Sequence, residues 1–82
     1  MEETKIYTTD EFENALIAKT IKEAAEVLTE RGYNAKNQIV GYLMSGDIGY
    51  ISSYKEIRNK IKAFDRTKIL EVLVDEFIKW DI

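Results

Sequence analysis

Hydrophobic residues recur at spacings of three and four along most of this chain, and this periodicity predicts helices. Between about residues 10 and 31, one apolar stripe is formed by Ile17, Ile21, Ala24 and Leu28. Gly32 is placed to end that helix in a left-handed conformation. Asn34 can then cap a shorter helix over about residues 35 to 44. The first half of the chain therefore predicts two helices joined by a tight turn.

The second half begins with a helix stop at Ser45, Gly46 and Asp47. This turn lacks the flanking glycines and the lysine of a phosphate-binding loop, so we interpret it as a stop and a new cap. Residues 48 to 51 predict an extended or turn-like connector. Ser53 and Glu56 then match a capping box, which predicts a third helix from there to about Phe64.

A fourth helix is predicted over about residues 66 to 80, with Asp65 as its cap. Its apolar residues occupy more than one stripe, so two interpretations stay open. It is either the central helix of a small bundle, or a helix with one face packed internally and the other against a partner chain. A strand over residues 69 to 74 is disfavoured because the segment lacks alternation. The predicted fold class is all-α: a flexible tail over residues 1 to 9, then a single compact domain of about four helices over residues 10 to 82.

Composition supports one small globular domain. The chain has 82 residues, 45% of them hydrophobic and 33% charged. A monomer of this size has about 4–12 kcal/mol of stability, so burying a further apolar face against a second copy would be a large relative gain. No apolar run approaches the roughly 20 residues that cross a bilayer, and the acidic start is unlike a signal peptide. We therefore expect a cytoplasmic protein without direct membrane insertion.

The residue inventory disfavours most catalysis. There is no cysteine or histidine, which excludes disulfides, thiolate chemistry and the usual zinc sites. The acidic residues fit exposed helix faces better than an active site. We therefore expect a protein that is not an enzyme and has no metal and no cofactor.

The net charge of −3 gives no overall attraction to nucleic acid. The one candidate basic patch is interleaved with acids, and we interpret it as a solvated face. It consists of Lys55, Arg58, Lys60, Lys62, Arg66 and Lys68.

Several polar residues are harder to explain as simple surface. They are Asn37, Gln38, Asp47, Arg58 and Asn59. If they lie near the core, each needs hydrogen-bond partners, and such a network fixes one packing arrangement. Because Asp47 and Arg58 flank the same connector, we predict an ion pair between them.

These residues belong to a longer run, which reads G-Y-N-A-K-N-Q-I-V-G-Y-L-M-S-G-D-I-G-Y-I from Gly32 and continues to R-N at Arg58. The run resembles the IreB family of small bacterial proteins, and the resemblance extends from about Ile17 to the end of the chain. The matching positions are Gly32, Tyr33, Asn34, Asn37, Gln38, Gly41, Tyr42, Ser45, Gly46, Asp47, Tyr50, Arg58 and Asn59. Where family members often have proline, this chain has Ala35, Ile48 and Ser52, so its connector is expected to be less rigid.

The resemblance implies a non-enzymatic, homodimeric regulator in the cytosol of bacteria. Such a protein acts downstream of a membrane Ser/Thr kinase in cell-wall homeostasis, cell-envelope stress and antibiotic tolerance. Its implied partners are itself, the kinase and its phosphatase, and an unknown downstream protein. The implied switch is threonine phosphorylation in the N-terminal tail, with Thr4 favoured because Glu3, Lys5 and Ile6 around it resemble the family's tail motif. Thr8 and Thr9 are further candidates, although either can instead cap the first helix.

A phosphate on the tail would add roughly −1.5 to −2 charge to an already acidic segment. It could loosen the tail from the basic residues of the third helix, or create a motif that a partner reads through arginines. The alternative function class is a small helical domain that binds nucleic acid or is associated with transcription. Salt-dependent retention on heparin or duplex DNA would distinguish that class from an acidic adaptor.

Overall fold

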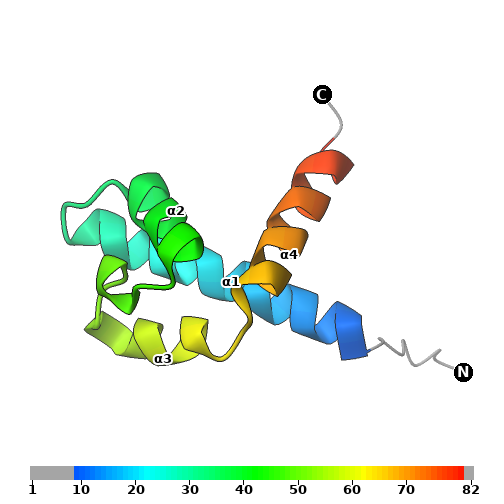
Figure 1. The fold of residues 1–82 in the computed structure, drawn as a ribbon, viewed down its shortest axis with the longest axis horizontal. Coiled ribbons are helices and arrows are strands. Elements are labelled where there is room, and N and C mark those ends of the chain that lie inside the picture. The colour runs from blue at the N-terminus through cyan, green and yellow to red at the C-terminus, as the bar shows by residue number, and fades with distance from the viewer. Residues whose placement is uncertain (1–8, 81–82) are drawn as a thin grey trace, which may run out of the picture.

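The computed structural model describes residues 9 to 80, which fold into four α-helices and two short 3-10 turns (Figure 1). In chain order these are α1 (Thr9–Glu30), α2 (Ala35–Ser45), η1 (Ile48–Tyr50), η2 (Tyr54–Glu56), α3 (Ile57–Lys62) and α4 (Arg66–Lys79). No strand occurs within this range. The predicted all-α fold class is therefore confirmed.

The long helix α1 is the scaffold against which α2, α3 and α4 pack (Figure 1). Every helix contributes side chains to the one core. The largest of those that are completely or almost completely enclosed are Ile17, Leu28, Ile51, Ile57, Ile61 and Ile69. In Figure 1, α4 diverges from α2 and α3 after its first turns. The interpretation of α4 as the central helix of a bundle is therefore wrong.

The ends of α1 and α2 follow the local sequence chemistry. Gly32 has φ +86°, and two backbone bonds close α1: the Gly32 amide donates to Thr29 and the Tyr33 amide donates to Leu28. Asn34 Oδ1 accepts the Asn37 amide at 3.0 Å, as a helix cap does. These predicted boundaries are confirmed.

The third helix does not start as the sequence predicted. Ser53 makes no side-chain capping bond, and the carboxylate of Glu56 accepts instead from Asn59 Nδ2 at 2.6 Å. Lys55 and Glu56 have φ of 55° and 60°, in the left-handed region that side chains other than glycine rarely adopt. The helix therefore begins only at Ile57, and the predicted capping box is wrong.

Lysines from the second half of the chain pair with carboxylates along α1. Lys60 Nζ lies 2.9 Å from Glu23, while longer pairs join Lys55 to Glu30 at 3.7 Å and Lys68 to Glu13 at 3.9 Å. The other basic side chains of the candidate patch include two, Arg58 and Arg66, that donate to backbone carbonyl oxygens. The basic residues therefore do not form one continuous cationic surface.

The Lys60–Glu23 pair gives a pH-dependent prediction. The hydrogen bond from Lys60 holds the pKa of Glu23 below its usual 4.5. A lowered pKa in the folded state stabilises the fold above about pH 4.5, and the contribution is lost as the pH falls through the folded value. In Lys60→Met, the Glu23 pKa is expected to rise towards 4.5, as followed by NMR of its side-chain carboxyl carbon. Lys62→Met is the matched control and should leave that titration unchanged; an unchanged Glu23 pKa in Lys60→Met would contradict the pair.

Helix α4 has two different faces. Ile69 and Val72 are buried against α1, and Leu73 is partly buried. On the other face, Leu70 and Val74 are exposed.

The start of α4 differs in detail from the prediction. Asp65 occupies the cap position with extended backbone but makes no side-chain capping bond. Across the described range, no helix combines the length and the hydropathy that a bilayer crossing requires.

Candidate functional site

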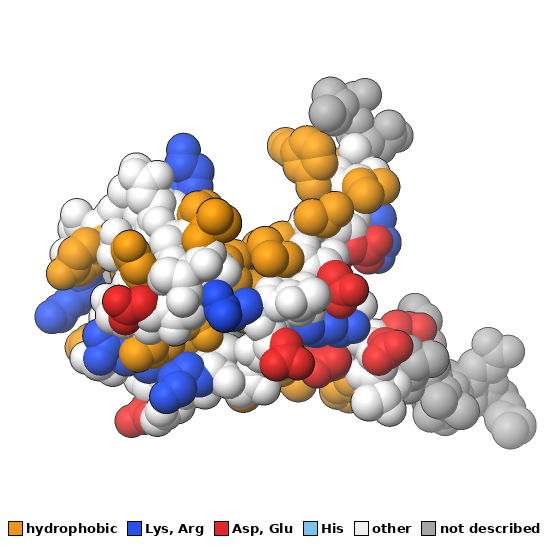
Figure 2. Space-filling view, viewed as in Figure 1, with side chains coloured by type: hydrophobic (Ala, Val, Ile, Leu, Met, Phe, Trp, Pro, Cys, Tyr) orange, Lys and Arg blue, Asp and Glu red, His pale blue; other side chains and the backbone are white. Residues whose placement is uncertain are grey.

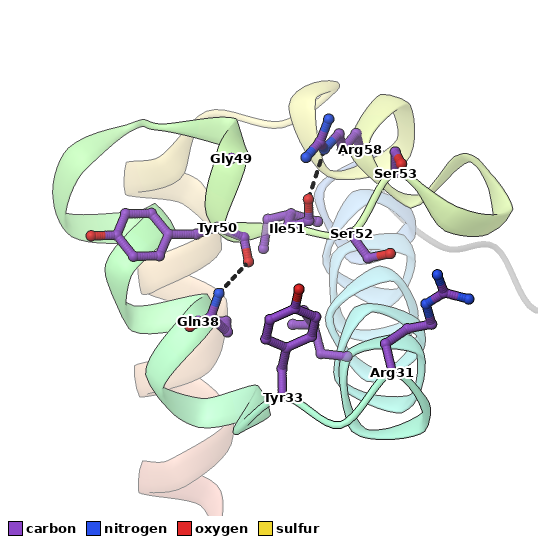
Figure 3. A pocket seen from close by; sticks show the side chains of 10 residues that line it. Arg31, Tyr33, Gln38, Gly49, Tyr50, Ile51, Ser52, Ser53 and Arg58 are labelled. Carbon is purple, nitrogen blue, oxygen red and sulfur yellow. Dashed lines mark hydrogen bonds between the residues drawn. The ribbon is translucent and has the colours of Figure 1, made fainter.

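Two polar side chains of the signature run hold the connector between α2 and α3 by its backbone. Gln38 Nε2 donates to the carbonyl oxygen of Tyr50 at 3.1 Å, and Arg58 Nε donates to that of Ile51 at 2.7 Å (Figure 3). The two acceptors are consecutive, and Ile51 itself is buried. The connector is therefore clamped from α2 on one side and from α3 on the other.

The predicted ion pair between Asp47 and Arg58 is wrong. Asp47 Oδ1 accepts the Gly49 amide at 2.8 Å and caps η1, while Arg58 binds the connector backbone. Asp47 and Arg58 thus act on the same connector through separate backbone bonds. Most of the hydrogen bonds in this region are exposed, so they order the connector rather than form a buried network.

The turn at Ser45, Gly46 and Asp47 ends α2 as predicted. Ser45 Oγ donates to the Gly41 carbonyl at 2.7 Å and accepts the Asp47 amide at 3.0 Å. Gly46 has φ +78°, and a Cβ there would also lie 2.9 Å from the Arg66 guanidinium carbon. That guanidinium donates to the Leu43 carbonyl at 3.1 Å. The turn therefore also brings the start of α4 against the end of α2.

Gly41 is required by close packing. A Cβ at this position would lie 2.5 Å from the Tyr50 ring. We predict strong coupling between the two positions, because alanine favours a helix by about 1 kcal/mol over glycine, whereas overpacking costs about 1–3 kcal/mol. Gly41→Ala should lower the free energy of unfolding in the wild-type background and raise it in the Tyr50→Ala background. Urea denaturation of all four proteins measures the coupling, and additive effects would contradict the prediction.

A polar pocket of about 210 Å³ lies between the end of α1, the start of α2 and the connector. Buried Leu28 and Ile51 give it an apolar floor, and its rim carries the polar side chains of Arg31, Tyr33, Gln38, Ser52, Ser53 and Arg58. Figure 3 shows Tyr33 and Arg31 rising from the α1–α2 turn towards Ser52, with Arg58 on the α3 side of the connector. The volume is below the roughly 300–1,000 Å³ of usual small-molecule sites, so it suits a compact group.

The pocket is electropositive in an otherwise acidic protein. Two arginines line it and no carboxylate does. Neither arginine takes part in the four ion pairs of the described residues. Arg31 lies over the Tyr54 ring, 5.1 Å from its centroid, and Lys55 lies 5.4 Å from the same centroid. The arrangement can therefore donate several hydrogen bonds to a small anion.

A second surface of interest is the exposed apolar face of α4. Leu70, Val74, Phe77 and Ile78 follow one another at helical spacing and are all exposed; we call them the α4 stripe. Phe77 is 65% exposed and Ile78 is 73% exposed. Figure 2 shows hydrophobic side chains along the side of α4 that faces α2, with a hollow between the two helices. Exposed Val40 and Met44 of α2 lie outside the core as well.

One known protein family matches both the helical domain and the segment before it. The model of the family described as IreB regulatory phosphoprotein matches residues 2 to 79. The chain belongs to the IreB family. The match covers nearly the whole chain, so the resemblance carried by the signature run is confirmed.

The IreB-type signature residues have different structural roles. Gly32, Asn34, Gly46 and Asp47 end or cap helices. Tyr42 is buried, and Asn59 donates to Glu56. Asn37 contributes its backbone amide to the Asn34 cap. The signature therefore specifies the α2–connector–α3 region.

The threonines proposed as phosphoacceptors lie at the other end of this IreB-family chain. Thr4 and Thr8 are outside the described residues. Thr9 is the first residue of α1 and is exposed. The sequence interpretation overlooked Arg31, Ser52 and Ser53 as site residues, because only the fold brings these separate segments into one pocket. The available signal was the position of Arg31 immediately before the signature run.

Proposed function

We propose that this chain is a non-catalytic, homodimeric regulatory phosphoprotein of the bacterial cytoplasm. It acts in a Ser/Thr kinase pathway that controls cell-envelope stress and cell-wall homeostasis, and phosphorylation of Thr4 switches it. The observation that carries the proposal is the family match, which begins at residue 2 and so includes the segment with Thr4. The kinase and its phosphatase are the proposed upstream partners, with a further protein downstream.

The α4 stripe supports the dimeric part of the proposal. Large apolar side chains exposed along one helix face are typical of a protein interface. In a two-fold symmetric dimer the same patch serves both copies, so two α4 stripes can cover each other. Trp80, 69% exposed and in edge contact with Phe77 at 6.3 Å between ring centroids, extends the apolar surface to the end of the helix.

Nucleic-acid binding receives less support. The lysines of the candidate basic patch include three that are paired with α1 carboxylates, and this neutralises much of the positive charge that a phosphate backbone would need. We therefore do not propose it as the function.

The decisive experiment is to isolate the protein from growing and from cell-wall-stressed cells and to locate phosphate by peptide mass spectrometry. Phosphate on Thr4 that changes with stress is the expected result. Full peptide coverage of residues 1 to 12 without phosphate in either condition would overturn the proposed switch. Deletion of the kinase gene should abolish the modification, which separates this pathway from phosphorylation by another enzyme.

A further inference from the structure

The polar pocket has the donor set of a phosphate-monoester site. Its two arginines come from separate segments, Arg31 from the turn after α1 and Arg58 from α3, and Ser52 and Ser53 of the connector add hydroxyl groups to the lining. Arg58 uses its Nε on the Ile51 carbonyl, which fixes the guanidinium and leaves its terminal nitrogens to donate elsewhere. Clusters of arginine that form such charge-assisted bonds are the usual means of recognising phosphorylated side chains.

The backbone beside the pocket is held in a strained form. Lys55 and Glu56 both have positive φ, and residues held in such sparsely populated conformations tend to gather where a site needs a particular shape. Here they form η2, which directs Tyr54 towards Arg31. The Ser52 hydroxyl oxygen accepts the Tyr54 amide at 3.1 Å, so its own hydrogen is available to a ligand.

The N-terminal segment of the same copy cannot reach this pocket. Leu28 on the pocket floor lies 19 residues after Thr9 along α1, a distance of about 28 Å at 1.5 Å per residue. Thr4 precedes Thr9 by five residues, which span at most about 18 Å. The start of α1 and the connector lie at opposite ends of the molecule (Figure 1). The Cα atom of Thr4 therefore stops about 10 Å short of the level of Leu28, even with the segment folded straight back along α1.

We infer that this pocket binds the phosphorylated N-terminal segment of a second copy of the chain, with the phosphate of Thr4 between Arg31 and Arg58. The inference rests on the proposed function for the identity of the phosphorylated residue. Charge complementarity supports this occupant, because Glu2 and Glu3 precede Thr4 and no carboxylate lines the pocket. Phosphorylation would then create a contact between copies instead of changing the copy that carries it.

The test is binding of a labelled synthetic peptide of residues 1 to 10, phosphorylated on Thr4, to the unphosphorylated full chain, measured by fluorescence anisotropy. The same peptide without phosphate and a scrambled phosphopeptide are the ligand controls. We expect the native phosphopeptide alone to bind well, and Arg31→Gln and Arg58→Gln each to weaken it at least tenfold. Lys62→Gln removes one charge from α3 outside the pocket and should leave the affinity unchanged.

Other results would overturn the inference. Equal binding of the unphosphorylated peptide, or unchanged affinity in Arg31→Gln, would exclude a phosphate site in this pocket. Arg31→Gln is the deciding variant, because the Arg31 guanidinium lies over the exposed Tyr54 ring, whereas Arg58→Gln also removes a connector hydrogen bond. Equal binding of the scrambled phosphopeptide would exclude the second copy as the specific occupant. Because the peptide is synthetic, its result does not depend on whether cells phosphorylate Thr4, which mass spectrometry decides separately.

Discussion

Ile61→Ala is expected to lower the free energy of unfolding by about 2–5 kcal/mol, the usual range for deleting a fully buried isoleucine side chain. Ile61 is completely buried, and with Ile57 it attaches the six-residue helix α3 to the core. A domain of this size has about 4–12 kcal/mol in total. The variant should therefore lose a large part of its stability. It should also loosen the attachment of α3, which carries Arg58 of the polar pocket.

The measurement is urea denaturation followed by far-ultraviolet circular dichroism, at one fixed protein concentration because association affects apparent stability. Lys62→Ala is the matched control, since it alters the neighbouring exposed residue of the same helix, and it should change stability by less than about 0.5 kcal/mol. A loss below about 1 kcal/mol in Ile61→Ala would contradict the enclosed position of this side chain.

Phe77→Glu combined with Ile78→Glu is expected to dissociate the proposed dimer. In a symmetric interface the double variant places four carboxylates on apolar surface. Each substitution also removes an apolar side chain whose burial contributes about 1.5–3 kcal/mol to association. Because each 1.4 kcal/mol is tenfold in affinity, we expect the dissociation constant to rise at least about 100-fold. The fold should survive, since both residues are largely exposed within one chain.

Sedimentation equilibrium of the wild type and the variant measures this directly. Leu16→Glu is the control, because Leu16 is 50% exposed but lies on α1 beside α3 and away from the α4 stripe. A monomeric wild type would refute the dimer. If the variant associates with the wild-type association constant, the α4 stripe is not part of the dimer interface.

Helix ends that depend on neighbouring residues could be predicted from the sequence. Gly32, Asn34 and Gly46 act through their own backbone freedom or a side chain that reaches three residues along the chain. The start of α3 could not be predicted in this way. Ser53 and Glu56 have the spacing of a capping box, but burial of Ile51 and Ile57 on either side of η2 fixes that segment in a different conformation.

The direction of α4 and the polar pocket depend on contacts between distant segments. The periodicity of α4 indicated two apolar faces, but not that only the face of Ile69 and Val72 would be covered within one chain. The pocket joins Arg31 to Ser52 and Arg58, and no local spacing rule links these positions.

The outer half of α4 should open without the rest of the molecule. From Val74 to Trp80 every side chain is exposed, so these turns are held by backbone hydrogen bonds and by local contacts within α4, such as the Lys79–Asp75 ion pair at 3.0 Å, rather than by burial against the core. Their amides should exchange with solvent through local fraying, much faster than those of α1 around Ala24 and Leu28, which require global unfolding. Any partner that covers the α4 stripe must also order these turns, so part of its binding free energy is spent on the helix itself. Slowed exchange confined to this half of α4 would thus report occupancy of the surface in a mixture where the partner has not been identified.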